Sequence, residues 1–198
     1  GDMTTLNSTP MANRTHLAIF GRRNAGKSTL INALTNQQLA VVSEVAGTTT
    51  DPVFKAMEFL PIGPVVMIDT AGFDDEGELG GLRVAKTMEV LRKTDLAILV
   101  ISAEDGVTPE ETAFAAELKA KGISAVAAVN KADRHPVSAE DVGRIGKELG
   151  MPAAAVSAAT RAGIEELKEL LAHNDKYDES LLRVVGDLIK PGDFVVLV

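Results

Sequence analysis

Short apolar runs alternate with amphipathic segments along most of the chain. This alternation is typical of an α/β protein, in which helices cover both faces of a mostly parallel sheet. One connection differs, because only Pro-Ile-Gly-Pro at 61–64 separates two apolar runs, and so short a link permits only an antiparallel hairpin. The pattern predicts strands over 15–20, 53–60, 65–69, 95–101, 124–130 and 153–156, and helices over 27–34, 79–92, 109–120, 139–149 and 164–171.

Composition narrows the class of protein. The 198 residues are 45% hydrophobic and 24% charged, which is typical of a globular chain with a sizeable core. The net charge of −8 disfavours nucleic acid as the main partner, because phosphate binding favours a basic face. Without cysteine, the chain can form neither a disulfide nor a thiolate-held zinc or iron–sulfur site. No apolar run approaches the ~18 residues of a membrane span, and we expect a cytoplasmic protein.

The two ends of the chain differ from its centre. Residues 1–13 are polar and are predicted to be a disordered leader, whereas residues 14–172 carry the alternating pattern of one domain. A polar linker is predicted next, then a helix over 180–190 and a strand over 194–198. That strand has no partner in the sequence, so residues 173–198 are predicted to be a linker and the truncated start of a second domain.

Residues 21–28, Gly-Arg-Arg-Asn-Ala-Gly-Lys-Ser, follow the first predicted strand and open the first predicted helix. This is the pattern and the context of a P-loop, in which backbone N–H groups and a helix start bind phosphates. Lys27 is predicted to reach the β- and γ-phosphates, and the Ser28 hydroxyl to bind Mg²⁺. The nucleotide-binding residues predicted here are Asn24, Ala25, Gly26, Lys27, Ser28 and Thr29.

Two further segments carry groups suited to a metal-bound triphosphate. Asp69 ends an apolar strand and is followed by Thr-Ala-Gly; an acid placed there beside a P-loop can hold Mg²⁺. The N–H of Gly72 can approach the γ-phosphate because no side chain blocks it. The loop at 47–51, Gly-Thr-Thr-Thr-Asp, offers a threonine hydroxyl that would complete the Mg²⁺ shell and release the loop after hydrolysis.

A base-recognition site is predicted at the ends of the last two strands. Asn130-Lys131-Ala132-Asp133 follows an apolar run, and a carboxylate there accepts from guanine N1–H and from its 2-amino group. Adenine lacks this pair of donors, so such a site rejects it strongly. Asn130 is predicted to brace the loops, and the Lys131 stem to lie along the base plane. Backbone N–H groups that meet the guanine oxygen are predicted at Ser157, Ala158 and Ala159.

Together these elements, in this order and spacing, resemble a Ras-like G domain of the P-loop NTPases over residues 15–172. The resemblance implies a six-stranded, mostly parallel sheet with one antiparallel strand, helices on both faces, and GTP and GDP as ligands. It also implies switch segments near 40–51 and 72–82. Phe73 stands where Ras-like enzymes carry a water-orienting glutamine. Either another residue orients the water, or hydrolysis is slow, about 10⁻⁴ to 10⁻³ s⁻¹.

The P-loop and the loop at 46–51, Ala-Gly-Thr-Thr-Thr-Asp, are similar to those of the TrmE–Era group of GTPases. In K⁺-activated members an asparagine and switch carbonyls hold K⁺ against the phosphates, which neutralises charge as an arginine finger does. The resemblance implies Mg²⁺ ligation by Ser28, Thr49 and Asp69. It implies K⁺ ligands at Asn24, Ser43, Val45 and Thr48, and a water-orienting acid at Asp75. The catalytic residues predicted on this basis are Lys27, Thr49, Gly72 and Asp75.

Residues 45–80 resemble the HydF family of FeFe-hydrogenase maturation GTPases, above all in the Gly-Pro-Val turn at 63–65 and the acidic run at 74–80. Residues 21–24 and 191–198 share the resemblance. HydF proteins join a G domain, a dimerisation domain and a cysteine-bearing cluster domain, and serve as scaffolds for a di-iron precursor. The resemblance implies other maturation proteins and the hydrogenase as partners, a possible homodimer, and a cluster site outside these cysteine-free residues.

Two alternative functions are also compatible with the motifs. One is a TrmE–Era-type GTPase acting in tRNA modification or ribosome assembly, although the acidic balance counts against RNA binding. The other is an interaction module that binds nucleotide without hydrolysing it, which Phe73 favours.

Overall fold

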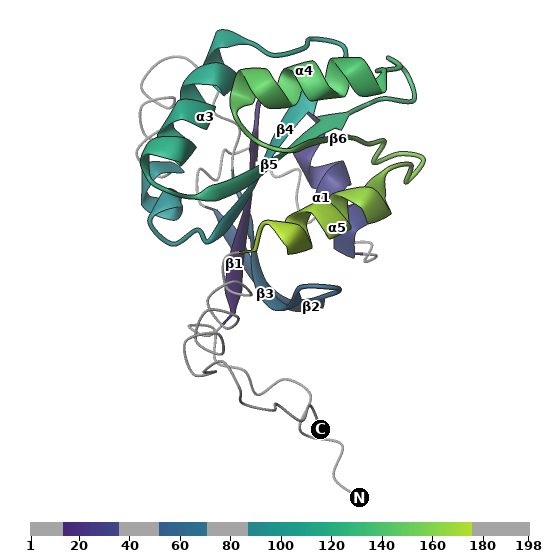
Figure 1. Ribbon diagram of the computed structural model, residues 1–198. Helices are drawn as coiled ribbons and strands as arrows, with labels where there is room; N and C mark the ends of the chain where they lie inside the picture. Colours follow the sequence, from purple (N-terminus) through teal and green to yellow (C-terminus); the bar gives the residue numbers. More distant parts are fainter. Residues whose placement is uncertain (1–13, 36–51, 71–86, 176–198) are drawn as a thin grey trace, which may run out of the picture.

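The computed structural model describes residues 14–35, 52–70 and 87–175. A six-stranded sheet runs through its centre in the order β2-β3-β1-β4-β5-β6, with helices on both faces (Figure 1). β2 is antiparallel to β3, and every other pair of neighbours is parallel. The strands are β1 (Thr15–Gly21), β2 (Val53–Phe59), β3 (Gly63–Asp69), β4 (Leu96–Ser102), β5 (Ser124–Asn130) and β6 (Ala153–Ala155).

Two apolar clusters fill the space between the sheet and its helices. α1 (Lys27–Thr35) and α5 (Ile164–His173) contribute to one cluster, and α3 (Pro109–Ala120) and α4 (Ala139–Leu149) to the other. Alternate residues of β4 enter the two clusters, and all seven are buried. Burial on both faces explains why this strand is one continuous apolar run in the sequence.

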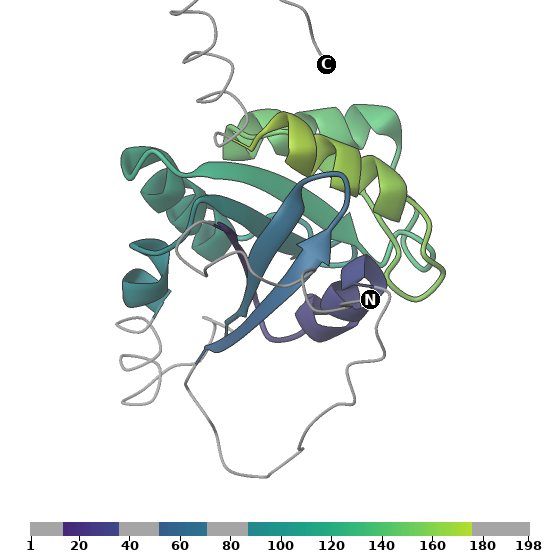
Figure 2. The same ribbon diagram turned by 90° about the horizontal axis from the view of Figure 1, so that it is seen from below.

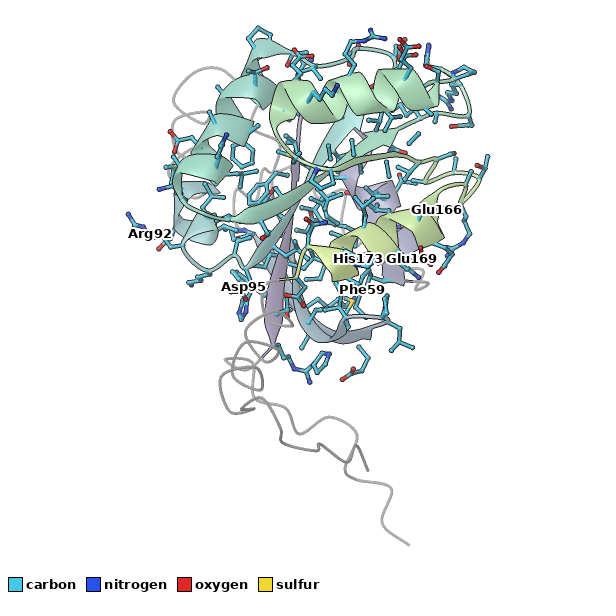
Figure 3. The ribbon with its side chains drawn as sticks, viewed as in Figure 1. Phe59, Arg92, Asp95, Glu166, Glu169 and His173 are labelled. Atoms are coloured by element: carbon cyan, nitrogen blue, oxygen red, sulfur yellow. The ribbon has the colours of Figure 1, made fainter. Side chains whose placement is uncertain are left out.

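The β2–β3 hairpin forms one edge of the sheet and is drawn in blue in Figure 2. Its register runs from Val53 opposite Asp69 to Phe59 opposite Gly63, so the antiparallel hairpin predicted from the short Pro-Ile-Gly-Pro link is confirmed. β2 is mostly exposed, and Phe59 is its one fully buried residue. Phe59 lies beside α5 (Figure 3), with Lys168 Nζ 5.8 Å from its ring centroid.

Local capping signals explain why several predicted boundaries agree with the structure. Thr108 and Ser138 precede α3 and α4 with capping boxes that involve Glu111 and Asp141, and Gly150 ends α4 in the left-handed conformation. α3 and α4 therefore have the predicted bounds, and β5 also has the bounds predicted for it. The bounds of the other strands and of α1 and α5 differ from prediction by one or two residues; β4, for example, runs one residue later at both ends.

Several predicted elements lie outside the described residues. Only 87–91 of the helix predicted over 79–92 are described as helical. The leader at 1–13, the helix at 180–190 and the strand at 194–198 are not among the described residues. Within the ranges that the structure describes, no helix has the length and apolarity needed to cross a lipid bilayer.

The strand register brings the predicted functional residues to one edge of the sheet. Gly21 pairs with Val100, and Ser102 pairs with Asn130, so β1, β4 and β5 end close together. β3 joins them because Asp69 pairs with Ile19 of β1. The carboxyl ends of parallel strands are where open α/β sheets bind ligands, and the P-loop and the Asn130 segment both begin there.

Candidate functional site

The segment at 21–28 forms a tight loop between β1 and α1. The Ala25 N–H donates to the carbonyl oxygen of Arg22 at 3.1 Å, and Gly26 adopts a φ of 87°. Lys27 begins α1 and is only 7% exposed. Its Nζ donates to the carbonyl oxygen of Gly21 at 3.0 Å, so the side chain curls back over the loop. A tight glycine-containing loop that leads into a helix can present backbone N–H groups and a lysine to a phosphate.

Gly26 is required by two features of this loop. Its φ of 87° lies in the left-handed region that side chains disfavour. A Cβ built on it would lie 2.5 Å from Nδ2 of Asn130, far closer than real Cβ contacts. The close approach of the Asn130 amide to the loop backbone therefore depends on the missing side chain.

Asn130 joins three loops at the edge of the sheet. Its Nδ2 donates to the carbonyl oxygen of Ala25 at 2.9 Å, and its Oδ1 accepts from the backbone N–H of Ala158 at 3.1 Å. The side chain is buried, with 3% exposure. Both ends of the amide are thus satisfied, which a buried amide needs. The bracing role predicted for Asn130 agrees with these contacts.

Lys131 makes a second connection between the same loops. Its backbone is left-handed, with a φ of 66°, which turns the chain sharply after β5. Its Nζ donates to the carbonyl oxygen of Asn24 at 2.6 Å, across 107 residues of sequence. The aliphatic stem therefore spans the space between the Asn130 segment and the P-loop. The structure thus brings the two motifs together.

Asp133 is exposed, and one of its oxygens is held in place. Oδ1 accepts from the hydroxyl of Ser157 at 3.0 Å, and that hydroxyl accepts from the N–H of Thr160 at 3.1 Å. Ser157 itself is buried, at 1% exposure. The loop after β6 therefore orients the carboxylate while Ala158 and Ala159 follow directly in the chain. A carboxylate fixed in this way can accept a pair of N–H donors from a planar ring edge.

Asp69 ends β3 at the same edge of the sheet. Burial raises the pKa of its carboxyl, and the nearby Lys27 ammonium partly opposes that rise. Thr70 follows and is buried, and its hydroxyl donates to the carbonyl oxygen of Ile19 at 2.6 Å. This bond ties the end of β3 to β1 just before the P-loop. Thr70 was not among the predicted site residues. The sequence signal that could have indicated it is a threonine directly after the acid that ends the strand.

The donor set at this edge fits Mg²⁺. Ser28 is exposed in the first turn of α1, and Asp69 offers a carboxylate. Hard oxygen donors of this kind suit Mg²⁺, which protein sites commonly hold through one or two side chains together with phosphate oxygens. The described ranges contain no cluster of three or more His, Cys, Asp or Glu side chains that could hold a metal ion.

Several predicted site residues lie outside the described residues. These are the predicted K⁺ ligands of the first switch, the Mg²⁺ threonine and the second-switch residues: Ser43, Val45, Thr48, Thr49, Gly72, Phe73 and Asp75. Asn24, the remaining predicted K⁺ ligand, is described and exposed, and its carbonyl accepts from Lys131.

A family model described as 50S ribosome-binding GTPase matches residues 16–131, from β1 through the Asn130 segment. The chain belongs to the 50S ribosome-binding GTPase family. This membership confirms the P-loop GTPase and the guanine nucleotide ligand expected from the motifs.

Curated members of this GTPase family match most of the chain. The chain is 38% identical over 167 residues to the tRNA modification GTPase MnmE of Heliobacterium modesticaldum, covering 82% of this chain and 34% of MnmE. It is 33% identical over 181 residues to the GTPase Der of Persephonella marina, covering 85% of this chain and 40% of Der. The chain thus spans between a third and two fifths of these relatives' length. Both relatives are GTPases, which confirms the expected enzyme class.

Solved structures of this GTPase type share the fold. A single-residue variant of Aquifex aeolicus Era bound to GDP.AlF4- superposes with a TM-score of 0.69 at 24% identity, over 80% of this chain and 56% of that one. The G domain of the T. maritima FeoB iron transporter superposes with a TM-score of 0.59 at 25% identity, covering 81% of this chain and 98% of that domain. The six-stranded G-domain fold predicted from the sequence is confirmed.

Proposed function

We propose that this chain is the GTP-hydrolysing switch domain of a larger protein, that its turnover is stimulated by K⁺, and that the larger protein is a HydF-type metallocofactor scaffold. One observation carries the nucleotide site. Lys131 and Asn130 bond to the loop at 24–25, so that an oriented carboxylate at Asp133 and the phosphate loop share one edge of the sheet. A guanine base and its phosphates would each find their matching groups there.

Each described residue has a defined task in this proposal. The backbone of 24–27 and the Lys27 ammonium bind and orient the β- and γ-phosphates, and Asp133 selects guanine. Ser28 and Asp69 would hold Mg²⁺, directly or through water. Mg²⁺ supplies charge neutralisation on the phosphate oxygens when bound. Thr49, Gly72 and Asp75 are proposed to complete the metal shell, contact the γ-phosphate and orient the attacking water.

Selection of guanine can be tested with a nucleotide whose base lacks one of the two hydrogen-bond donors proposed to contact Asp133. Inosine diphosphate has no 2-amino group, so the chain should bind it about tenfold to a hundredfold more weakly than GDP, as expected for a bond to a charged acceptor. The Asp133→Ala variant should bind both equally. Asp105→Ala, an exposed acid on the adjacent β4–α3 loop, is the matched control and should keep the preference. Calorimetric titrations in which ADP competes equally with GDP would contradict the guanine assignment.

The K⁺ proposal rests on Asn24, which is exposed at the tip of the P-loop and whose backbone carbonyl is fixed by Lys131. A monovalent cation beside it would neutralise charge developing between the β- and γ-phosphates. GTP turnover should therefore be faster in KCl than in NaCl, and Asn24→Ala should lose that difference. Asn174→Ala, at the far end of α5, is the matched control. Equal rates in both salts for the unaltered chain contradict the proposal.

The scaffold assignment rests on the family resemblance of residues 45–80, of which the β2–β3 hairpin is described. Its partners would be other hydrogenase maturation proteins and the hydrogenase, reached through the full-length protein. The full-length protein should transfer a di-iron precursor to apo-hydrogenase, and it should transfer more with GTP than without it. A non-hydrolysing variant such as Lys27→Ala should impair that transfer. No hydrolysis in a single-turnover assay with K⁺ and partners present would instead identify a binding module.

A second candidate is a role in tRNA modification or ribosome assembly, favoured by the 38% identity to MnmE and the match to Der. The net charge of −8 opposes direct RNA binding. Titration with tRNA and with ribosomal RNA at physiological salt separates the candidates. Specific RNA binding by the full-length protein that stimulates GTP turnover would favour this second role over the scaffold.

A further inference from the structure

The outer edge of β2 carries an unusual concentration of apolar surface. In the described ranges no strand pairs with this edge, so the backbone groups that point away from β3 form an open row. The large apolar side chains exposed in these ranges are Val53, Phe54 and Leu60, at 61%, 39% and 76% exposure, and all lie on or directly after β2. An open strand edge with apolar side chains is a template for another strand.

We infer that β2 pairs antiparallel with β2 of a second copy of this chain, with Ala56 opposite Ala56 across a two-fold axis normal to the sheet. Such an axis keeps each side chain on its own face of the sheet. The residue numbers of two paired residues must therefore differ by an even number. In this register Phe54 lies opposite Glu58 of the second copy, and Val53 lies opposite Phe59. The two sheets then form one continuous sheet of twelve strands.

The charges around β2 favour this register. Lys93 Nζ lies 5.6 Å from the ring centroid of Phe54. Glu58 of the second copy, placed opposite Phe54, would reach Lys93, and the two-fold axis makes this contact twice. If residue 55 instead of residue 56 lay on the two-fold axis, Lys55 would lie opposite Lys55 of the second copy. Like charges directly opposite each other destabilise strand pairs. If residue 57 lay on the axis, Glu58 would lie opposite Ala56, away from Lys93.

A second copy fits this edge better than a strongly charged partner. β2 carries one cation and one anion, Lys55 and Glu58, so its own charge is balanced. Its apolar side chains occupy both faces of the strand, because Phe54 lies on the side of Ile68 and Val53 on the side of Asp69. Pairing with an identical strand covers both faces at once and satisfies the open backbone row.

Cysteine cross-linking tests the register directly, because the chain has no cysteine of its own. Residues directly opposite in an antiparallel pair have Cα atoms about 4.5–5.5 Å apart, within the disulfide range. The exposed Ala56→Cys variant should therefore form a disulfide-linked dimer under copper–phenanthroline oxidation. Lys55→Cys alone should not form a disulfide, because the Cα atoms of the two copies of residue 55 lie diagonally across the strand pair, farther apart than that range. A mixture of Lys55→Cys and Met57→Cys should cross-link as a heterodimer.

Sedimentation velocity of the 198-residue chain supplies the second readout. The unaltered chain should show a concentration-dependent dimer. Glu58→Lys should weaken dimerisation about tenfold through two repelling contacts with Lys93, and adding Lys93→Glu should restore it. Glu140→Lys, on the exposed side of α4, is the charge-matched control and should leave the dimer unchanged. A monomer at about 100 µM overturns the inference, as does a dimer that Glu58→Lys leaves intact or whose Ala56→Cys chains do not cross-link.

Discussion

The Asn130 amide lies 2.9 Å from the carbonyl oxygen of Ala25 and so joins residues 105 positions apart in the sequence. The same side chain accepts from the N–H of Ala158. One buried residue thus joins the loop after β1, the segment after β5 and the loop after β6. Its removal affects the whole site without touching a substrate.

The Asn130→Ala variant should lose both affinity and stability. It leaves the Ala25 carbonyl and the Ala158 N–H without buried partners, at a cost of about 1–3 kcal/mol for each group. We expect the free energy of unfolding to fall by about 2–6 kcal/mol, and GDP affinity to fall at least tenfold. Urea unfolding and calorimetric titration measure the two effects. Asn174→Ala, which removes one bond to Leu170 at the end of α5, should leave GDP affinity unchanged.

Gly26→Ala should abolish nucleotide binding through the loop backbone. The added Cβ would lie 2.5 Å from Asn130 Nδ2, at a φ of 87°. Gly143→Ala is the matched control, because nothing lies within 4 Å of its Cβ position and it sits inside α4. The control should stabilise the fold by up to about 1 kcal/mol, since alanine favours helices. GDP binding by Gly26→Ala at the unaltered affinity would show that the loop relaxes around the methyl group.

Thr70→Val should weaken metal-dependent binding more than nucleotide binding itself. The variant keeps the side-chain shape but removes the hydroxyl that donates to Ile19 at 2.6 Å. We expect the Mg²⁺ concentration for half-maximal GTP turnover to rise severalfold, while GDP affinity without Mg²⁺ changes little. Thr70→Ser retains the donor and should behave as the unaltered chain. An equal loss with and without Mg²⁺ would assign Thr70 a purely structural role.

Asp69 should make stability depend on pH in a defined direction. Burial raises the pKa of this carboxyl in the folded chain above its value in the unfolded chain. Its contribution to stability is therefore fully present below the unfolded value of 3.8 and is lost as pH rises through the folded value. Asp69→Asn should be more stable than the unaltered chain at pH 7, and this difference should shrink toward pH 4. Urea unfolding across that range without Mg²⁺ measures it; a difference constant with pH would contradict the burial argument.

The parts of the fold predicted well from the sequence are those with local signals. Capping boxes begin α3 and α4, Gly150 ends α4, and the Pro-Ile-Gly-Pro segment at 61–64 indicated the β2–β3 hairpin. Strand order across the sheet is a long-range property that local sequence signals do not determine, and no strand order was predicted. β6 has three residues and a weak, alanine-rich pattern. Its predicted end, residue 156, is therefore one residue beyond the observed end.

In the candidate site, too, some features were predicted from the sequence and others were not. Motif spacing predicted Lys27, Asn130 and Asp133, because each opens, ends or follows a regular element. Their partners could not be read from spacing, since the bonds from Lys131 to Asn24 and from Asp133 to Ser157 depend on how separate loops meet. Thr70 was missed because its role depends on the neighbouring strand β1, which local sequence does not reveal.

The bond from Lys131 to Asn24 has a kinetic consequence. Because this bond joins the segment after β5 to the phosphate loop, we expect it to hold the two parts of the candidate site in place before a nucleotide arrives. A nucleotide would then meet a preformed surface, and its arrival would be governed by diffusion and charge. Weakening either half should therefore shorten the residence time of the nucleotide while leaving its association rate nearly constant.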